Sequence, residues 1–71
     1  MKYFVVVLPK DLEGNVNRQI YEFIDLESAK QSFHENCGKY FKSETLQSVS
    51  VCVLDEKCTE RMSDSWVSET I

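Results

Sequence analysis

The stretch VNRQIYEFIDLESAKQSFHENCG, residues 16–38, decides the fold, because its hydrophobic period changes at Asp25. Up to Ile24 the residues predict a strand with Val16, Ile20 and Ile24 on one face and Gln19, Tyr21 and Phe23 on the other. Beyond Asp25 the apolar side chains follow the spacing i, i+3, i+7 and i+11, which forms one stripe of an amphipathic helix. This stripe consists of Leu26, Ala29, Phe33 and Cys37. The sequence therefore predicts a strand over residues 16–24 and then a helix.

The ends of this helix have their own signals. Asp25 is a good N-cap, and Glu27 favours the positive end of the helix dipole. Gly38 is expected at the C-terminal cap, so that the helix ends near Cys37. Tyr40 and Phe41 would then lie in a connection that folds back over the edge of the core.

The residues before this stretch predict a hairpin. Residues 2–9, KYFVVVLP, form a β-branched and aromatic run that is apolar on both alternating faces, as expected of a central strand. Pro9 is expected to end the strand because proline donates no backbone hydrogen bond. Residues 11–15, DLEGN, predict a turn in which Gly14 takes the left-handed conformation, followed by the antiparallel strand over residues 16–24.

A second hairpin is predicted after the helix. Residues 46–54, LQSVSVCVL, alternate cleanly, with valines on one face and Ser48, Ser50 and Cys52 on the other. Residues 55–57 form a polar turn. A weaker fourth strand is expected from Cys58 to about Trp66, followed by a polar end.

These elements predict an α+β fold, a two-layer ββαββ domain in which one helix packs on a four-stranded antiparallel sheet. Residues 1–71 form a single domain. Residues 1–54 supply the ββα unit and the third strand, and residues 55–71 supply an acidic last strand and tail. Because one helix cannot cover both faces of such a sheet, one apolar face is expected to remain open for a partner or a second copy.

Composition excludes several classes of function. The chain has 71 residues and a net charge of −4, so a direct nucleic-acid binder, which usually carries a basic patch, is not expected. The apolar run near Met1 is too short to span a membrane and lacks a signal-peptide cleavage region. Three cysteines without a CxxC pair indicate reduced thiols in a cytoplasmic protein.

No residue pattern indicates catalysis or a cofactor. A zinc site would need His34 with three cysteines, Cys37, Cys52 and Cys58, but they lack the usual knuckle spacing. Cys52 and Cys58 flank a short turn, which leaves a disulfide or redox pair open as an alternative. The carboxylates Asp55, Glu56 and Glu60 are expected to be solvated. We therefore predict no catalytic residue, no metal and no cofactor.

The charge distribution gives a sharper hypothesis. Residues 55–71 hold two basic and five acidic side chains, which suits an acidic edge that meets a basic surface on another protein. Within this stretch Trp66 and Met62 would serve as interface anchors, or alternatively cap the core. The predicted partner-binding residues are Trp66, Met62, Glu56, Glu60, Asp64 and Tyr40.

The order of elements, with the junction YEFIDLESAKQSF over residues 21–33, resembles small phage and prophage proteins of ββαββ form. Some of these are anti-CRISPR inhibitors, which bind a CRISPR effector complex and block its access to DNA. The resemblance implies a non-enzymatic inhibitor in the host cytoplasm whose partner is a nucleic-acid-binding effector complex. It carries over no catalytic residues, and the acidic chain departs from the basic faces of some members. The alternative is a homodimeric structural or small-ligand-binding module.

Overall fold

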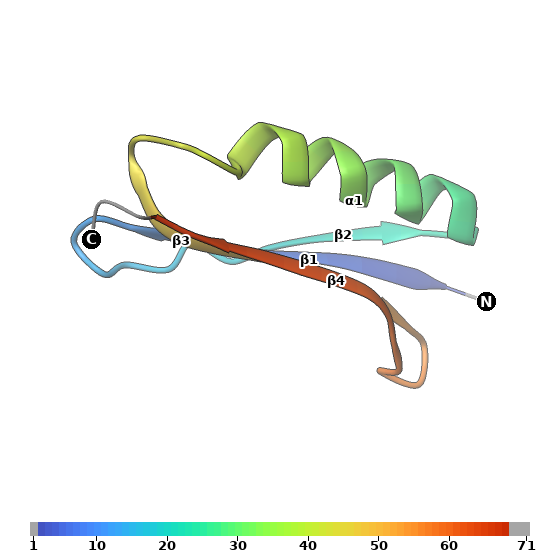
Figure 1. Cartoon of the computed structure of the whole chain (residues 1–71). Coiled ribbons are helices and arrows are strands. Elements are labelled where there is room, and N and C mark those ends of the chain that lie inside the picture. The colour runs from blue at the N-terminus through green and yellow to red at the C-terminus, as the bar shows by residue number, and fades with distance from the viewer. Residues whose placement is uncertain (1, 69–71) are drawn as a thin grey trace.

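The computed structural model describes residues 2–68, and it has one sheet with one helix packed on it (Figure 1). The elements are β1 (Tyr3–Asp11), β2 (Gln19–Phe23), α1 (Leu26–Tyr40), β3 (Leu46–Asp55) and β4 (Glu60–Val67). The strands lie in the order β2-β1-β3-β4, and all neighbours are antiparallel. The predicted α+β fold of order ββαββ is therefore confirmed.

The hydrophobic core lies between α1 and the face of the sheet that the helix covers. The two central strands contribute valines at alternate positions, and α1 contributes two residues of the predicted stripe. The buried hydrophobic residues are Val5, Val7, Ala29, Phe33, Val49, Val51 and Val53. Burial of each valine contributes about 1.5–3 kcal/mol. The alternation predicted for residues 46–54 is thus confirmed.

Pro9 does not end the first strand, contrary to the sequence prediction. It is buried within β1 opposite Val49, and the strand continues to Asp11. The carbonyl oxygen of Pro9 accepts a hydrogen bond from Asn17 N, so the backbone nitrogen of Pro9, which carries no hydrogen, points toward the β2 side of β1. The regular pairing of β1 with β2 ends at Gln19, before it reaches Pro9. The missing N–H therefore removes no hydrogen bond from that pairing.

The two hairpins are closed by the same turn. Each turn begins at an aspartate, Asp11 or Asp55, whose carboxylate accepts hydrogen bonds from the backbone N–H groups two and four residues later. The backbone carbonyl of the same aspartate accepts from the N–H three residues later, and its N–H donates to the carbonyl four residues later. This is a three-residue loop whose last residue is left-handed. Gly14 holds that position with φ 93°, as predicted, and Cys58 holds it with φ 61°.

The helix begins as predicted and ends later than predicted. Asp25 is the N-cap, and its carboxylate accepts from Ser28 N at 2.7 Å. Gly38, the predicted end, lies inside α1, which continues to Tyr40. The reason is that Tyr40 extends the apolar stripe beyond Cys37 and packs against the core. That packing outweighs the cost of about 1 kcal/mol of an exposed glycine within a helix.

The other boundaries shift by a few residues. Val16, expected in the second strand, forms only an isolated bridge with Lys10, and β2 is correspondingly short. The fourth strand begins at Glu60 rather than Cys58, and Arg61 is the extra residue of a bulge. The end of the predicted acidic tail, residues 69–71, lies outside the described residues.

Candidate interaction surface

The face of the sheet that lies away from α1 has no layer of described residues packed on it (Figure 1). We call it the open face, and the strand register defines its members. Its apolar centre consists of Phe4, Val6 and Leu8 of β1, Ile20 of β2, and Cys52 and Leu54 of β3. The second apolar face of β1, noted in the sequence, is therefore the centre of an uncovered surface.

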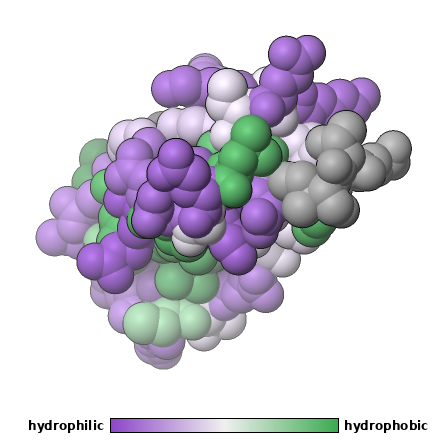
Figure 2. All heavy atoms as spheres, turned by 90° about the vertical axis from the view of Figure 1, so that its left-hand side faces the viewer, coloured by the Kyte–Doolittle hydropathy of each residue, from purple (hydrophilic) through white to green (hydrophobic). Residues whose placement is uncertain are grey.

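The open face carries several large hydrophobic side chains that are exposed to solvent. Leu8 is 37% exposed, Ile20 and Val16 are each 56% exposed, and Val67 is 66% exposed. The register places all four on this face, because Val16 is opposite Lys10 and Val67 is opposite Ser48. Figure 2, which looks along the strands at the end that holds the β1–β2 turn, shows hydrophobic residues among hydrophilic ones at that end. Large exposed apolar side chains that share one face make the open face the candidate interaction surface.

The part of the open face over β3 and β4 is polar rather than apolar. Directly opposed hydroxyl side chains line it, namely Ser50 with Ser65, and Ser63 opposite the Cys52 thiol. A shallow hollow of about 500 Å³ lies here between the two strands, with Glu60 at its margin. A surface that covered the open face would therefore meet aliphatic groups on one side and hydroxyl groups on the other.

The two ends of the open face differ in charge. Lys2 and Glu22 form an ion pair of 3.4 Å at one end, and Glu60 lies opposite Leu54 at the same end. Lys10 lies at the other end, opposite Ser48. In addition, the β3–β4 turn curls below the sheet on the side away from α1, at the end where Glu60 lies (Figure 1). The open face is therefore bordered by the projecting turn, and carries the acidic Glu60, at one end only.

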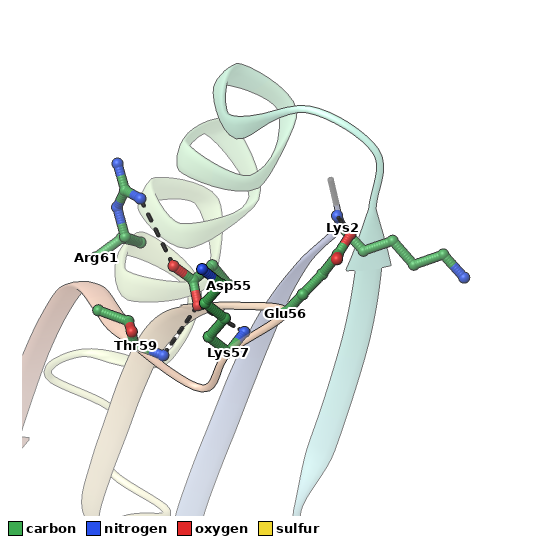
Figure 3. Close-up of polar contacts among 6 residues, drawn as sticks. All are labelled: Lys2, Asp55, Glu56, Lys57, Thr59 and Arg61. Carbon is green, nitrogen blue, oxygen red and sulfur yellow. Dashed lines mark hydrogen bonds and ion pairs between the residues drawn. The ribbon is translucent and has the colours of Figure 1, made fainter.

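Asp55 fixes this projecting turn, and it is not the solvated acid that the sequence predicted. Its Oδ1 accepts from Lys57 N at 2.9 Å and Thr59 N at 3.0 Å, while its Oδ2 lies 3.6 Å from the Arg61 guanidinium (Figure 3). These hydrogen bonds, chiefly the one from Thr59, lower the pKa of Asp55. Lys2 N also donates to the Glu56 carboxylate. The aspartate thus has a structural role.

The residues predicted to contact a partner do not share one surface. Trp66 and Met62 lie on the α1 side of β4 and pack against the core, which is the alternative role considered for them. Asp64 lies on that same side, whereas Glu60 lies on the open face. Tyr40 donates to Gln19 Oε1 at 3.2 Å and also packs on the core. The partner-binding role of these residues stays a prediction.

The histidine and the cysteines are not brought together. Cys37 faces the core from α1, Cys52 lies on the open face, and Cys58 lies in the projecting turn, all as free thiols. His34 is exposed, and its ring meets the edge of Phe33. Burial raises the pKa of the Cys37 and Cys52 thiols, with Asp64 and Glu60 respectively adding to the effect. Residues 2–68 contain no cluster of three side chains suited to a metal ion.

Within the described part of the chain, no helix is long and apolar enough to cross a membrane. The sequence was also compared with known proteins. Neither a protein family, nor a curated protein, nor a solved structure matches this chain.

Proposed function

We propose that this protein acts by binding another folded protein through the open face, and that it is not an enzyme. The observation that carries the proposal is the gathering of exposed Leu8, Val16, Ile20 and Val67 on the one uncovered face of the sheet. A monomer that left this surface in water would lose the stabilisation that burial gives to apolar side chains.

Binding is also favoured over catalysis by the positions of the reactive groups. A nucleophilic thiol needs a neighbouring base and a lowered pKa. Here His34 is exposed on α1, Cys52 lies on the far face of the sheet, and the pKa of Cys52 is raised. We place this binding in the cytoplasm, where thiols stay reduced.

The chemistry of the open face describes its partner surface. The matching surface is apolar where it meets Phe4, Val6 and Leu8 and accepts or donates hydrogen bonds where it meets the serines of β3 and β4. It carries positive charge toward the end that holds Glu60, where Glu22 already pairs with Lys2. Complementary charges at such a rim set orientation and rate more than affinity.

The test uses adjacent residues of β2 that point to opposite faces. Ile20→Lys places a charge on the open face, and Tyr21→Lys places the same charge on the α1 side. Cys52 reports coverage, because it lies in the centre of the open face. In extract of the source cell, alkylation of Cys52 should be at least fivefold slower than in the dilute purified protein, and Ile20→Lys should remove this difference. Equal labelling in both variants contradicts the proposal.

A second candidate is inhibition of a CRISPR-type nuclease complex, for which the net charge of −3 over residues 55–71 gives support. In this case β4, an outer strand, would meet a basic groove of the complex through Glu60 and Asp64, one on each of its faces. Reversal of both charges should weaken binding to a purified effector complex and reduce its salt dependence. Unchanged affinity and salt dependence would count against this candidate.

A further inference from the structure

We infer that the occupant of the open face is a second copy of this chain. The two copies are related by a two-fold axis that lies between the two sheets and runs across the strands. This inference rests on the proposed function and names its partner. In this arrangement the open faces of two sheets pack together, as the inner faces of a β-sandwich do. Strands of one copy run over the same strands of the other with their ends exchanged, and α1 of each copy lies on the outside.

The open face is just large enough for a weak specific interface. The four strands have nine, five, ten and eight residues, so at about 3.3 Å per residue and about 4.8 Å between strands the face of each copy covers about 500 Å². A pair would bury about 1,000 Å², which is the least that a specific interface should reach. With this axis the apolar side chains of β1 and β2 in the two copies face each other, and so do the serines of β3 and β4.

The projecting β3–β4 turn selects the direction of the axis. It rises from the open face at one end of the sheet only (Figure 1). A two-fold axis parallel to the strands would bring both turns to the same end, where they would hold the sheets apart. An axis across the strands sends each turn past the opposite end of the other sheet. The two sheets then meet along their length between the turns.

The charges agree with the same axis. If it crosses β1 between Val6 and Leu8, Lys10 of one copy stands over Phe4 of the other. The register places Glu22 and Leu54 on either side of Phe4, with Glu60 next to Leu54. Each Lys10 thus stands beside Glu22 of its partner, which Lys2 also contacts, while Glu60 stands over Val67 of the partner. An axis parallel to the strands would instead oppose Glu60 to the acidic end of the second copy.

The first measurement is sedimentation equilibrium of the whole chain from about 1 to 300 μM. We expect a reversible monomer–dimer equilibrium in the wild type and in Tyr21→Lys. Ile20→Lys should raise the dissociation constant at least tenfold. Both substitutions change exposed side chains of the same outer strand, and circular dichroism would confirm that both variants fold. A wild type that stays monomeric throughout this range overturns the inference.

The second measurement separates this inference from the proposed function. Alkylation of Cys52 is followed by mass spectrometry against Cys37, which faces the core and also has a raised pKa. If the dimer forms, the rate of alkylation of Cys52 divided by that of Cys37 should fall at least fivefold between 1 and 300 μM. If this ratio stays constant with purified protein but Cys52 is protected in cell extract, the dimer is overturned and the proposed function is kept. If Cys52 is protected neither in purified protein nor in extract, both the dimer and the proposed function are overturned.

The direction of the axis is tested by charge exchange. Glu22→Lys and Lys10→Glu should each weaken the dimer severalfold at low salt, and the double variant should recover most of the loss. This recovery is expected only if the two residues approach each other between copies, because they lie at opposite ends of one sheet. A dimer that Glu22→Lys strengthens would indicate the parallel axis, which sets Glu22 against Glu60 of the second copy, and would overturn this part of the inference.

Discussion

Cys58 has a backbone conformation that glycine adopts without cost. Its φ of 61° lies in the left-handed region, and Gly14 holds the equivalent position in the other hairpin. A side chain there costs about 1–2 kcal/mol, of which the greater freedom of unfolded glycine offsets a part. The second hairpin is therefore strained at one residue, while the first is not.

This difference gives a paired prediction. Cys58→Gly should raise the free energy of unfolding by about 0.5–1 kcal/mol, and Gly14→Ala should lower it by about 1 kcal/mol. A Cβ at Gly14 would come no nearer than 4.0 Å to Lys10, so that loss reports backbone conformation rather than a clash. Urea denaturation with an unchanged slope is the measurement. A loss of stability in Cys58→Gly contradicts the interpretation.

Asp55 should make stability depend on pH. Its folded-state pKa is lowered below the usual value of 3.8 by the hydrogen bonds from Thr59 and Lys57. Its contribution is therefore present above about pH 4 and is lost as the pH falls through the folded pKa. Asp55→Asn should lower stability at pH 7 and flatten the decline between pH 5 and 2.

Asp11 provides the comparison, because it accepts the same pattern of hydrogen bonds and its pKa is also lowered. Asp11→Asn should flatten the same acid decline in a separate and additive way. Chemical denaturation at a series of pH values measures both effects. An acid decline that is equally steep in the double variant would show that other carboxylates cause it.

At the scale of the element, α1 depends on its N-cap. Asp25 accepts from both the backbone and the hydroxyl of Ser28. Asp25→Ala should lower the free energy of unfolding by about 1 kcal/mol. Glu27→Gln, in the same first turn, removes a similar charge but no cap and should cost less than half as much. Equal losses in the two variants would assign the effect to charge rather than to capping.

The elements that the sequence predicted correctly are those in which local pattern and tertiary packing agree. The valines of β3 alternate and also meet α1, and Asp25 both favours the cap and forms it. Pro9 and Gly38 were interpreted as ends because each disfavours its element locally. In both cases the surrounding packing decided, since Pro9 is buried opposite Val49 and Tyr40 continues the helix onto the core.

The candidate site was predicted less well than the fold. The two apolar faces of β1 signalled an uncovered surface, whereas the residues predicted for binding, all except Tyr40, were taken from the acidic end, and their role stays a prediction. Alternation alone does not say which face of β4 the helix covers, so Trp66 was open to either role. The sequence assigned Ile20 to one face of the strand predicted over residues 16–24. Only its register with Val6 places it beside the centre of the open face.

At the scale of the whole molecule, the proposed dimer predicts a melting temperature that depends on concentration. Association stabilises the folded chain in proportion to the logarithm of its concentration. A hundredfold dilution across the dissociation constant should therefore lower the melting temperature by several degrees, and Ile20→Lys should remove this dependence. Calorimetry at two concentrations is the measurement. An equal shift in wild type and variant would point to aggregation instead.

The strand order has a consequence for the time that folding takes. The central pair of the sheet joins β1 to β3, and it aligns Tyr3 with Asp55 across most of the chain. The first hairpin and the helix contain only local contacts and can form within microseconds. The central pair must first close a long loop, so the rate-limiting step should fall in the slower range of two-state domains. During that interval the edge of β1 that pairs with β3 has no partner, and unpaired strand edges are prone to pair with other chains.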